Sequence, residues 1–362
     1  MMRKKIILGS TGGPATEGVY NSFLMESQFE KEEVIGIGSD VNSLLSSNII
    51  KKYLFPSSNS NDYIDSLNLI IRDEKPDFLH FQNDNELFQI SKNREKIDNF
   101  KNLFFMPSHS DFLNCAFKYN SYLKFREKGI VVPKNILIND VNDLKVAFKE
   151  LTSNKREIWL RSNTIGGGGQ GSLKTNDFDF AKAWINHHKG WGLFIAAELL
   201  TASTVTWQSL WFEGTLIISQ SRKRQSWIHG NRTLSGVTGV TGVGEIYSNQ
   251  DLDKICMNAI YAITDKPHGL YGVDLAYDFN GVPNPTEINI GRFFTTIEFF
   301  SKLGLNFPLI YKNIFLYNTF PNFKNVFSPI NSNTFWIRNM DTKPKLIHEN
   351  EIKLNINEKY IF

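Results

Sequence analysis

The sequence GLYGVDLAYDFNGVPNPTEINIGR, at residues 269–292, decides the fold of this chain. Its two apolar runs flank an Asn-Gly pair, which is a strong signal for a β-hairpin. Asp274 lies on the first predicted strand, and Glu287 and Asn289 lie on the second. Side chains two positions apart in a strand share a face, so these three are predicted to converge on one patch.

Two carboxylates and one amide are hard oxygen ligands. Such a set suits Mg²⁺, which takes its remaining oxygens from water and substrate phosphates. The alternative is a hairpin whose polar face is merely solvated, because acidic residues near turns are common. The other segments of the chain favour the metal site.

The composition is that of a globular protein. At 362 residues the chain is long enough for more than one core. Its 40 Lys and Arg against 37 Asp and Glu leave a net charge of only +3. This balance argues against nucleic acid or an anionic membrane as a partner.

Cysteine usage indicates a reducing compartment. Cys115 and Cys256 are far apart, without further cysteines or nearby histidines, so neither a disulfide framework nor a zinc site is indicated. The apolar run 6–8 ends at Gly9, too early for a signal peptide, and no run of about 18 apolar residues occurs. We therefore expect a cytoplasmic protein.

The first 106 residues alternate strands and helices. Strands are predicted near residues 5–8, 33–40 and 77–84, and this alternation is typical of a parallel sheet with covered faces. The Gly-rich turn at 9–13 offers NAD or FAD binding as an alternative function. It does not match G-x-G-x-x-G, however, and Pro14 is typical of a helix start.

Residues 102–137 are predicted to run as a strand, a helix and an exit loop. Lys118 lies on the helix, with Gly129 as its C-terminal cap and Pro133 beyond. Taken alone, a helical lysine more often lies on a solvated face than in a site.

A glycine-rich segment follows a short strand that ends at Arg161. Five of the six positions 166–171 are glycine, and ordering glycine costs conformational entropy. A flap that covers phosphates with its backbone N–H groups explains this composition, whereas the alternative is a floppy surface hairpin. The segment is not a Walker loop, because Gly-Lys-Ser/Thr is missing.

Two antiparallel strands are predicted on either side of residues 212–215. Before them, residues 195–200 offer apolar walls and the Glu198 carboxylate for an adenine ring, or an ordinary buried strand end. Arg222 and Arg224 share one strand face, where they bind anions or form a solvated edge.

The rest of the chain carries less chemistry. Residues 230–246 are rich in Gly and Thr and are predicted to form a mobile loop over the site. Residues 251–264 have helical spacing, and the segment from Arg292 to about 316 is predicted to be helical. The Asn-rich remainder is predicted to form short strands.

Together these segments resemble the ATP-grasp superfamily, in the branch that includes the carbamoyl phosphate synthetase large chain and biotin carboxylase. The resemblance spans roughly residues 4–305 in the order of that family. It implies an α/β and α+β fold, in which a Rossmann-like pre-ATP-grasp domain precedes a two-lobed ATP-grasp fold. The implied divisions are 1–106 for the first domain, 107–195 for the lobe with the flap, 196–325 for the lobe with the metal site, and 326–362 for a C-terminal tail.

The resemblance also implies roles for single residues. The spacing of 13 positions from Asp274 to Glu287, and of two more to Asn289, matches the metal ligands of the family. Lys118 matches the phosphate-binding lysine ahead of its G-I-x-x-P motif, and Arg161 the cation before its flap. The implied ATP-binding set is Lys118, Arg161, Gly166, Gly167, Gly168, Gly169, Gln170, Gly171, Glu198 and Leu200.

Two departures put the acceptor site in question. A second carboxylate that often holds the ribose has no counterpart, since Thr204 and Gln208 occupy that neighbourhood. The E-x-N-x-R motif of the family is extended by Gly291, which moves the arginine to Arg292. Neither a second ATP-grasp copy nor a biotin-carrier domain is visible in the sequence.

The implied activity is ATP-dependent ligation of a small carboxylate to an amine or other nitrogen nucleophile through an acylphosphate. ATP and Mg²⁺, with Mn²⁺ as an alternative, are the implied cofactors, and a homodimer is the general expectation. Arg292, Arg222 and Arg224 are candidates for the carboxylate or the developing charge. A non-catalytic nucleotide-binding regulatory or assembly protein and a kinase-like enzyme are the other two hypotheses.

Overall fold

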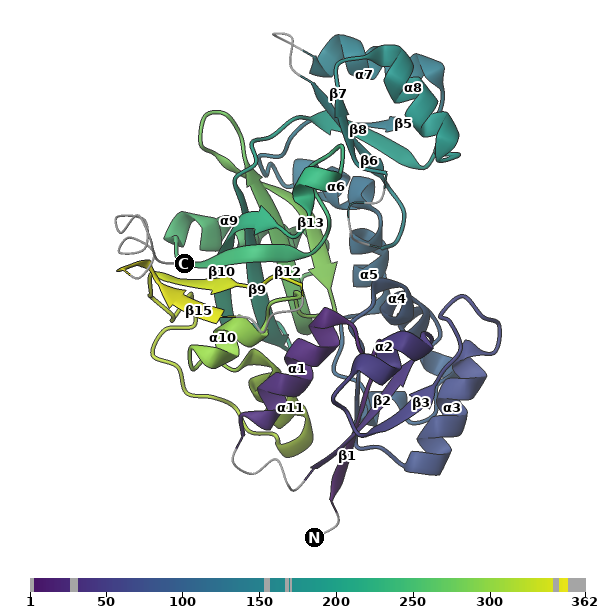
Figure 1. The fold of residues 1–362 in the computed structure, drawn as a ribbon, viewed down its shortest axis with the longest axis vertical. Helices are drawn as coiled ribbons and strands as arrows, with labels where there is room; N and C mark the ends of the chain where they lie inside the picture. Colours follow the sequence, from purple (N-terminus) through teal and green to yellow (C-terminus); the bar gives the residue numbers. More distant parts are fainter. Residues whose placement is uncertain are drawn as a thin grey trace.

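The computed structural model describes residues 3–26, 32–152, 157–166, 169, 171–340 and 345–350. These residues form three β-sheets, which Figure 1 shows as a parallel sheet near the N-terminus, a large central sheet and a small lobe at the top. Among them no helix is long and apolar enough to cross a membrane.

The N-terminal sheet is parallel, in the order β3-β2-β1-β4. The central strand β1 buries Ile6, Ile7 and Leu8 completely, as expected for a strand covered on both faces. The predicted alternation of strands and helices is confirmed. Its elements are β1 (Lys4–Leu8), α1 (Pro14–Leu24), β2 (Glu32–Gly38), α2 (Val41–Ser46), β3 (Lys51–Leu54), α3 (Tyr63–Glu74), β4 (Phe78–His80) and α4 (Asp84–Lys92).

The Glu17 carboxylate binds the Gly-rich turn between β1 and α1. The Glu17 side chain accepts hydrogen bonds from the backbone N–H of Gly12 at 3.2 Å and from the Ser47 hydroxyl at 2.5 Å. Pro14 is the first residue of α1, as predicted. Because Glu17 already binds the amide that a dinucleotide phosphate would need, the structure disfavours NAD or FAD binding here.

The strand predicted near residues 102–107 is wrong. Leu103 has a helical backbone (φ −119°, ψ −23°), the segment bonds to β4 through Leu79 N to Leu103 O at 2.8 Å, and Pro107 has no N–H with which to continue a ladder. Two short 3₁₀ helices, η2 (Arg94–Lys96) and η3 (Phe100–Asn102), precede it.

Two helices replace the single one predicted next. α5 (His109–Ala116) and α6 (Lys118–Glu127) are separated at Phe117, whose extended backbone (φ −106°, ψ 114°) breaks the helix. Gly129 follows α6 with φ +69°, and its N–H donates to Arg126 O, so the predicted cap is confirmed.

The lobe at the top of Figure 1 has a four-stranded sheet with its own apolar core. Its strands pair antiparallel in the order β5-β8-β6-β7, and Leu144 and Ile185 from its two helices are fully buried. The elements are β5 (Asn135–Ile138), α7 (Val141–Leu151), β6 (Ile158–Ser162), β7 (Leu173–Thr175), α8 (Phe178–His187) and β8 (Phe194–Glu198).

The large sheet is antiparallel, in the order β13-β12-β9-β10-β11-β14-β15. Part of the loop predicted over residues 230–246 is instead β11, which pairs antiparallel with β10. The elements are β9 (Thr204–Phe212), β10 (Thr215–Trp227), η5 (Gly230–Arg232), β11 (Thr241–Tyr247), α9 (Gln250–Ile263), β12 (Gly269–Tyr277), β13 (Pro283–Ile290), α10 (Glu298–Lys302), α11 (Phe307–Tyr317), β14 (Thr334–Ile337) and β15 (Lys345–His348).

A buried ion pair joins α11 to the N-terminal sheet. Lys312 Nζ is fully buried and lies 2.6 Å from the Glu32 carboxylate on β2, and 2.7 Å from Glu26. Glu32 is 3% exposed, so removal of the lysine would leave a charge buried without its partner.

We therefore expect Lys312→Met to lower the free energy of unfolding by about 3–5 kcal/mol. Lys254→Met, in α9, is the matched control, since Lys254 forms an exposed i,i+3 pair with Asp251 and should change stability by less than about 1 kcal/mol. Guanidinium chloride unfolding measures both variants. Equal effects would contradict the role of Lys312.

Candidate functional site

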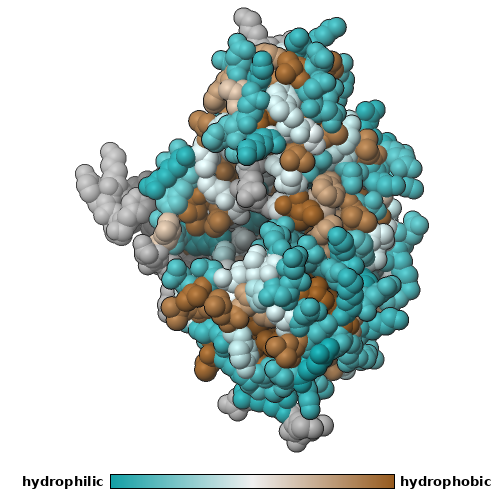
Figure 2. Space-filling view, turned by 90° about the vertical axis from the view of Figure 1, so that its right-hand side faces the viewer, coloured by the Kyte–Doolittle hydropathy of each residue, from teal (hydrophilic) through white to brown (hydrophobic). Residues whose placement is uncertain are grey.

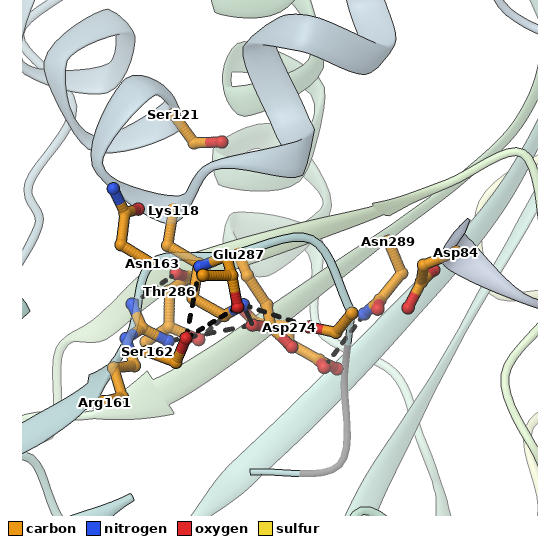
Figure 3. A network of polar contacts seen from close by, with 12 residues as sticks. Asp84, Lys118, Ser121, Arg161, Ser162, Asn163, Asp274, Thr286, Glu287 and Asn289 are labelled. Carbon is orange, nitrogen blue, oxygen red and sulfur yellow. Dashed lines mark hydrogen bonds and ion pairs between the residues drawn. The ribbon is translucent and has the colours of Figure 1, made fainter. Parts of the chain in front are cut away.

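The predicted hairpin is confirmed, with β12 and β13 pairing so that Asp274 lies directly opposite Glu287 and Gly272 opposite Asn289. The three polar side chains share one face of the sheet. Asn289 Nδ2 donates to Asp274 Oδ2 at 3.0 Å (Figure 3). The sequence pattern therefore correctly placed these side chains together.

A β-bulge interrupts the hairpin beside this patch. Asp274 pairs with Glu287 but Leu275 pairs with Pro285, so Thr286 is the extra residue. Its carbonyl oxygen accepts a hydrogen bond of 2.9 Å from Arg161 Nη2, on β6 of the small lobe. A bulge re-aims the neighbouring side chains, and here it also gives the small lobe a point of attachment.

Cations from two other segments face Glu287. Lys118 Nζ and Arg161 Nη1 each lie 3.7 Å from Glu287 Oε2 (Figure 3). Burial raises the pKa of Glu287, but the charges of Lys118, Arg161 and Arg292 outweigh it and hold the pKa below its usual value. Glu287 is therefore a carboxylate at neutral pH.

The first turn of α6 is bound to the loop after β6. Asn163 Oδ1 accepts from the backbone N–H of Tyr119 at 2.9 Å, and Lys118 Nζ lies 3.4 Å from Gly166 O. The loop thus caps a helix end that Phe117 cannot cap, since that residue has no polar side-chain atom. Asn163 was not predicted, because its partner is 44 residues away.

A cavity of about 510 Å³ lies between the small lobe and the large sheet, within the range of small-molecule sites. Figure 2 shows the hollow between these parts. It brings together most of the predicted site residues, namely Lys118, Arg161, Gly166, Gly169, Glu198, Leu200, Arg222, Arg224, Asp274, Glu287, Asn289 and Arg292. Gly167, Gly168 and Gln170 lie outside the described residues.

Gly171 is the one described residue of the predicted ATP-binding set that does not line this cavity. A Cβ there would lie 2.6 Å from the Phe194 ring, and its φ of +65° also favours glycine. Its carbonyl accepts from Trp184 Nε1 at 2.9 Å. Packing within the small lobe therefore explains this glycine.

The predicted adenine slot lies at the end of β8. Pro133, Ala197 and Leu200 give it apolar walls. The Glu198 carboxylate accepts from the backbone N–H of Lys134 through Oε2 at 2.7 Å. This bond fixes the carboxylate at the edge of the cavity.

Arg222 is 1% exposed and bonds only to threonine hydroxyls among the described residues. Nη1 donates to Thr241 at 2.8 Å and Thr296 at 3.0 Å, Nη2 donates to Thr206 at 3.0 Å, and the buried Nε has no partner there. The guanidinium also lies 4.9 Å from the Phe294 ring centre. Arg222 is thus a fixed cation without a carboxylate in contact.

Arg224 has a more open position on the same face of β10. Nη1 donates to Thr204 at 2.9 Å, and the guanidinium stacks 3.8 Å from the Trp227 ring centre. Burial lowers the pKa of Arg224, opposed by Asp274 and Glu287. Arg224 is therefore better placed than Arg222 to meet a ligand.

Thr206 connects these arginines to the hairpin. Its hydroxyl donates to Asp274 Oδ1 at 2.5 Å and accepts from Arg222 at 3.0 Å. This residue was missed, because threonine in a strand is common and nothing local marks its contact with Asp274.

Arg292 turns toward the N-terminal sheet. Gly291 has φ +77° and ends the hairpin, and Arg292 then forms a bidentate ion pair with Asp84, at the start of α4, and donates to Asn289 Oδ1. Asp84 is the third residue, after Asn163 and Thr206, that sequence reasoning missed, because its partner lies 208 residues away.

Comparison with known proteins gives evidence at the level of the fold. No protein-family model and no curated protein sequence matches this chain. Among solved structures, carboxyaminoimidazole ribonucleotide synthase from Aspergillus clavatus, complexed with ATP, is similar with a TM-score of 0.68 at 12% identity, over 93% of this chain and 82% of that one. L-amino acid ligase from Bacillus licheniformis has a TM-score of 0.65 at 13% identity, over 93% and 79%.

A third similar structure is the biotin carboxylase domain of 2-oxoglutarate carboxylase from Hydrogenobacter thermophilus, in complex with magnesium ADP, ADP and bicarbonate. Its TM-score is 0.68 at 13% identity, over 93% of this chain and 75% of that one. The chain has the ATP-grasp fold. The predicted fold class is confirmed, and the large cavity lies between the small lobe and the large sheet.

The electrostatics of this site can be tested through Glu287. We expect Lys118→Met to raise the pKa of Glu287, because one of the cations that lower it is removed. NMR titration of ¹³C-glutamate-labelled protein measures this pKa. Lys124→Met, further along α6 and paired with the exposed Glu127, should leave it unchanged. A Glu287 pKa that does not rise in Lys118→Met would contradict the assigned interaction.

Proposed function

We propose that this chain is an ATP-dependent ligase that joins a carboxylate to an amine or another nitrogen nucleophile. The observation that carries the proposal is the patch of Asp274, Glu287 and Asn289 at one wall of the large cavity, faced by Lys118 and Arg161. Carboxylates and cations that line one cavity suit a metal-bound polyphosphate.

The hairpin residues fit Mg²⁺, with Mn²⁺ as the alternative. The proposed ligands are two carboxylates and one amide. Among the described residues no group of three His, Cys, Asp or Glu side chains is arranged to hold a metal. Glu287 is held in its charged form, and Thr206 fixes one oxygen of Asp274. A bound Mg²⁺ would supply neutralisation of the charge on the β- and γ-phosphates.

The other cavity residues fit the nucleotide. The slot near Glu198 and Leu200 has the apolar walls and the fixed carboxylate that an adenine ring and its amino group require. Lys118 and Arg161 line the same cavity and lie beside Glu287 of the hairpin, where phosphates would bind, and Gly166 and Gly169 line the same space.

The chemistry then needs mainly positioning and charge stabilisation. An oxygen of the substrate carboxylate attacks the γ-phosphorus, and the bond from that phosphorus to the bridging oxygen breaks as ADP leaves. The nitrogen lone pair next attacks the acyl carbon, the carbon–oxygen bond to phosphate breaks, and the nitrogen loses a proton. Arg224 and Arg292 stabilise the negative charge.

The similar solved structures support this class of reaction. They include a carboxyaminoimidazole ribonucleotide synthase with ATP and an L-amino acid ligase. An amino acid ligase forms a bond between carbon and nitrogen, as the proposed reaction does.

We expect Glu287→Gln to reduce ATP-dependent phosphate release by at least 100-fold, because it removes one charged oxygen ligand from the site. The assay screens pools of carboxylates and amines with ATP and Mg²⁺. Glu213→Gln is the control, since Glu213, in the turn between β9 and β10, is exposed and pairs with Lys266. Full ligation by Glu287→Gln would overturn the proposal.

The products of this screen also separate the other hypotheses. Nucleotide binding without phosphate release for any pool would indicate a regulatory or assembly protein. A stable phosphorylated product without a second substrate would indicate a kinase-like enzyme.

We expect Arg292→Ala to raise the KM for the carboxylate substrate about tenfold or more and to change the KM for ATP little. Loss of one charge-assisted contact to a substrate is of this size. Steady-state kinetics with each substrate varied in turn measures the two values. An unchanged KM for the carboxylate would place that substrate elsewhere, with Arg224 as the next candidate.

A further inference from the structure

A second, smaller cavity adjoins the large one. Its volume is about 40 Å³, which is room for about three water-sized groups. Lys118, Gly166, Glu287 and Asn289 line both cavities, so the two share a wall. The small cavity lies against α4, α5 and the edge strand β13 and is therefore next to the proposed site of phosphate chemistry.

The walls of this small cavity are mainly apolar. Phe88 of α4, Phe112 and Cys115 of α5, and Ala116 at the end of α5 contribute to it. Its polar lining residues are Asp84, Lys118, Glu287 and Asn289. The lining therefore combines apolar surface with charged groups.

The charges of the two cavities differ. The large cavity is lined by six cations, Lys118, Arg161, Lys174, Arg222, Arg224 and Arg292, against the three carboxylates of Glu198, Asp274 and Glu287. Such a surplus suits a polyphosphate. The small cavity has two carboxylates, Asp84 and Glu287, and Lys118 as its own cation, with Arg292 bound to Asp84. This balance disfavours a ligand that carries only negative charge.

The ion pair between Arg292 and Asp84 leaves hydrogen-bonding positions that a ligand can use. Arg292 donates through Nε and Nη2, while its Nη1 has no partner within the part of the chain that the structure describes. The Asp84 side chain is 27% exposed and that of Arg292 is 14% exposed. Each carboxylate oxygen can accept more than one hydrogen bond, so Asp84 can bind an ammonium group and keep Arg292.

We propose that the small cavity binds the side chain of a zwitterionic α-amino acid, with the ammonium on Asp84 and the carboxylate between Arg292 and Lys118. The inference rests on the proposed function and names its carboxylate substrate. The cavity volume limits the side chain to about three non-hydrogen atoms, the number in valine, and the single methyl group of alanine also fits. In this position the carboxylate lies beside Glu287 and Asn289, where the phosphates of ATP are proposed to end.

Calorimetric binding tests the ammonium site. L-alanine, L-valine, propionate and ethylamine are titrated into the full chain, both with and without magnesium ADP. We expect L-alanine to bind at least tenfold more tightly than propionate or ethylamine, since neither analogue carries both charges. Asp84→Asn should weaken L-alanine at least tenfold while the Kd for magnesium ADP changes less than twofold.

The control for Asp84→Asn is Asp143→Asn. Asp143 also lies in the first turn of a helix, α7, and accepts a local backbone hydrogen bond from Asn139. Asp143→Asn should change the affinity for neither L-alanine nor magnesium ADP. Equal weakening of alanine and propionate by Asp84→Asn would contradict an ammonium site.

The apolar lining of the small cavity is tested by Ala116→Leu, whose larger side chain is expected to fill part of the cavity. We expect this variant to lose at least tenfold more affinity for L-valine than for glycine. A variant that was merely less stable would weaken both amino acids alike. An unchanged ratio of the two affinities would overturn the side-chain pocket.

The remaining outcomes separate this inference from the proposed function. If magnesium ADP binds but none of the amino acids does, the small-cavity proposal fails and the ATP-dependent activity stands. If magnesium ADP does not bind to the unmodified chain, the proposed function fails and the substrate assignment fails with it.

Discussion

The direct pairing of Asp274 with Glu287 is the constraint on which this structure depends. Like charges on opposed strand positions destabilise a sheet, so the hairpin needs cations nearby. Lys118 comes from α6, Arg161 from the small lobe, and Arg292 from the end of the hairpin. The site is therefore complete only when the separate parts of the chain have assembled, and the bulge at Thr286 is where the small lobe is attached.

The threonines of β9 and β11 have a related role, because they bind the guanidinium groups of Arg222 and Arg224, which contact no carboxylate among the described residues. Thr206 joins Asp274 to Arg222, and Thr241 bonds to both Arg222 and Arg224. The close packing requires Gly244, where a Cβ would lie 2.8 Å from Arg222 Cδ. The contacts of Thr241 and Gly244 with the buried Arg222 thus explain these two residues of the Gly- and Thr-rich segment.

The N-terminal parallel sheet takes part in the site although it lies outside the large cavity. It supplies Asp84, and the buried pair of Lys312 with Glu32 ties this sheet to α11. A second cavity is formed where α4 and α5 meet β13. The large cavity has excess positive charge, whereas the small cavity has balanced charge. This difference is the basis for assigning the nucleotide to the large cavity and the amino acid side chain to the small one.

The sequence by itself determined the hairpin, the parallel sheet, the strand that ends at Arg161 and the position of Lys118 at a helix, because alternation, Asn-Gly and glycine caps act over a few residues. It also placed Asp274, Glu287 and Asn289 on one face. Only the tertiary structure decided the partners of Arg292 and Arg222, the break at Phe117 and the strand within residues 230–246. These features depend on contacts between residues far apart in the chain, which local spacing does not encode.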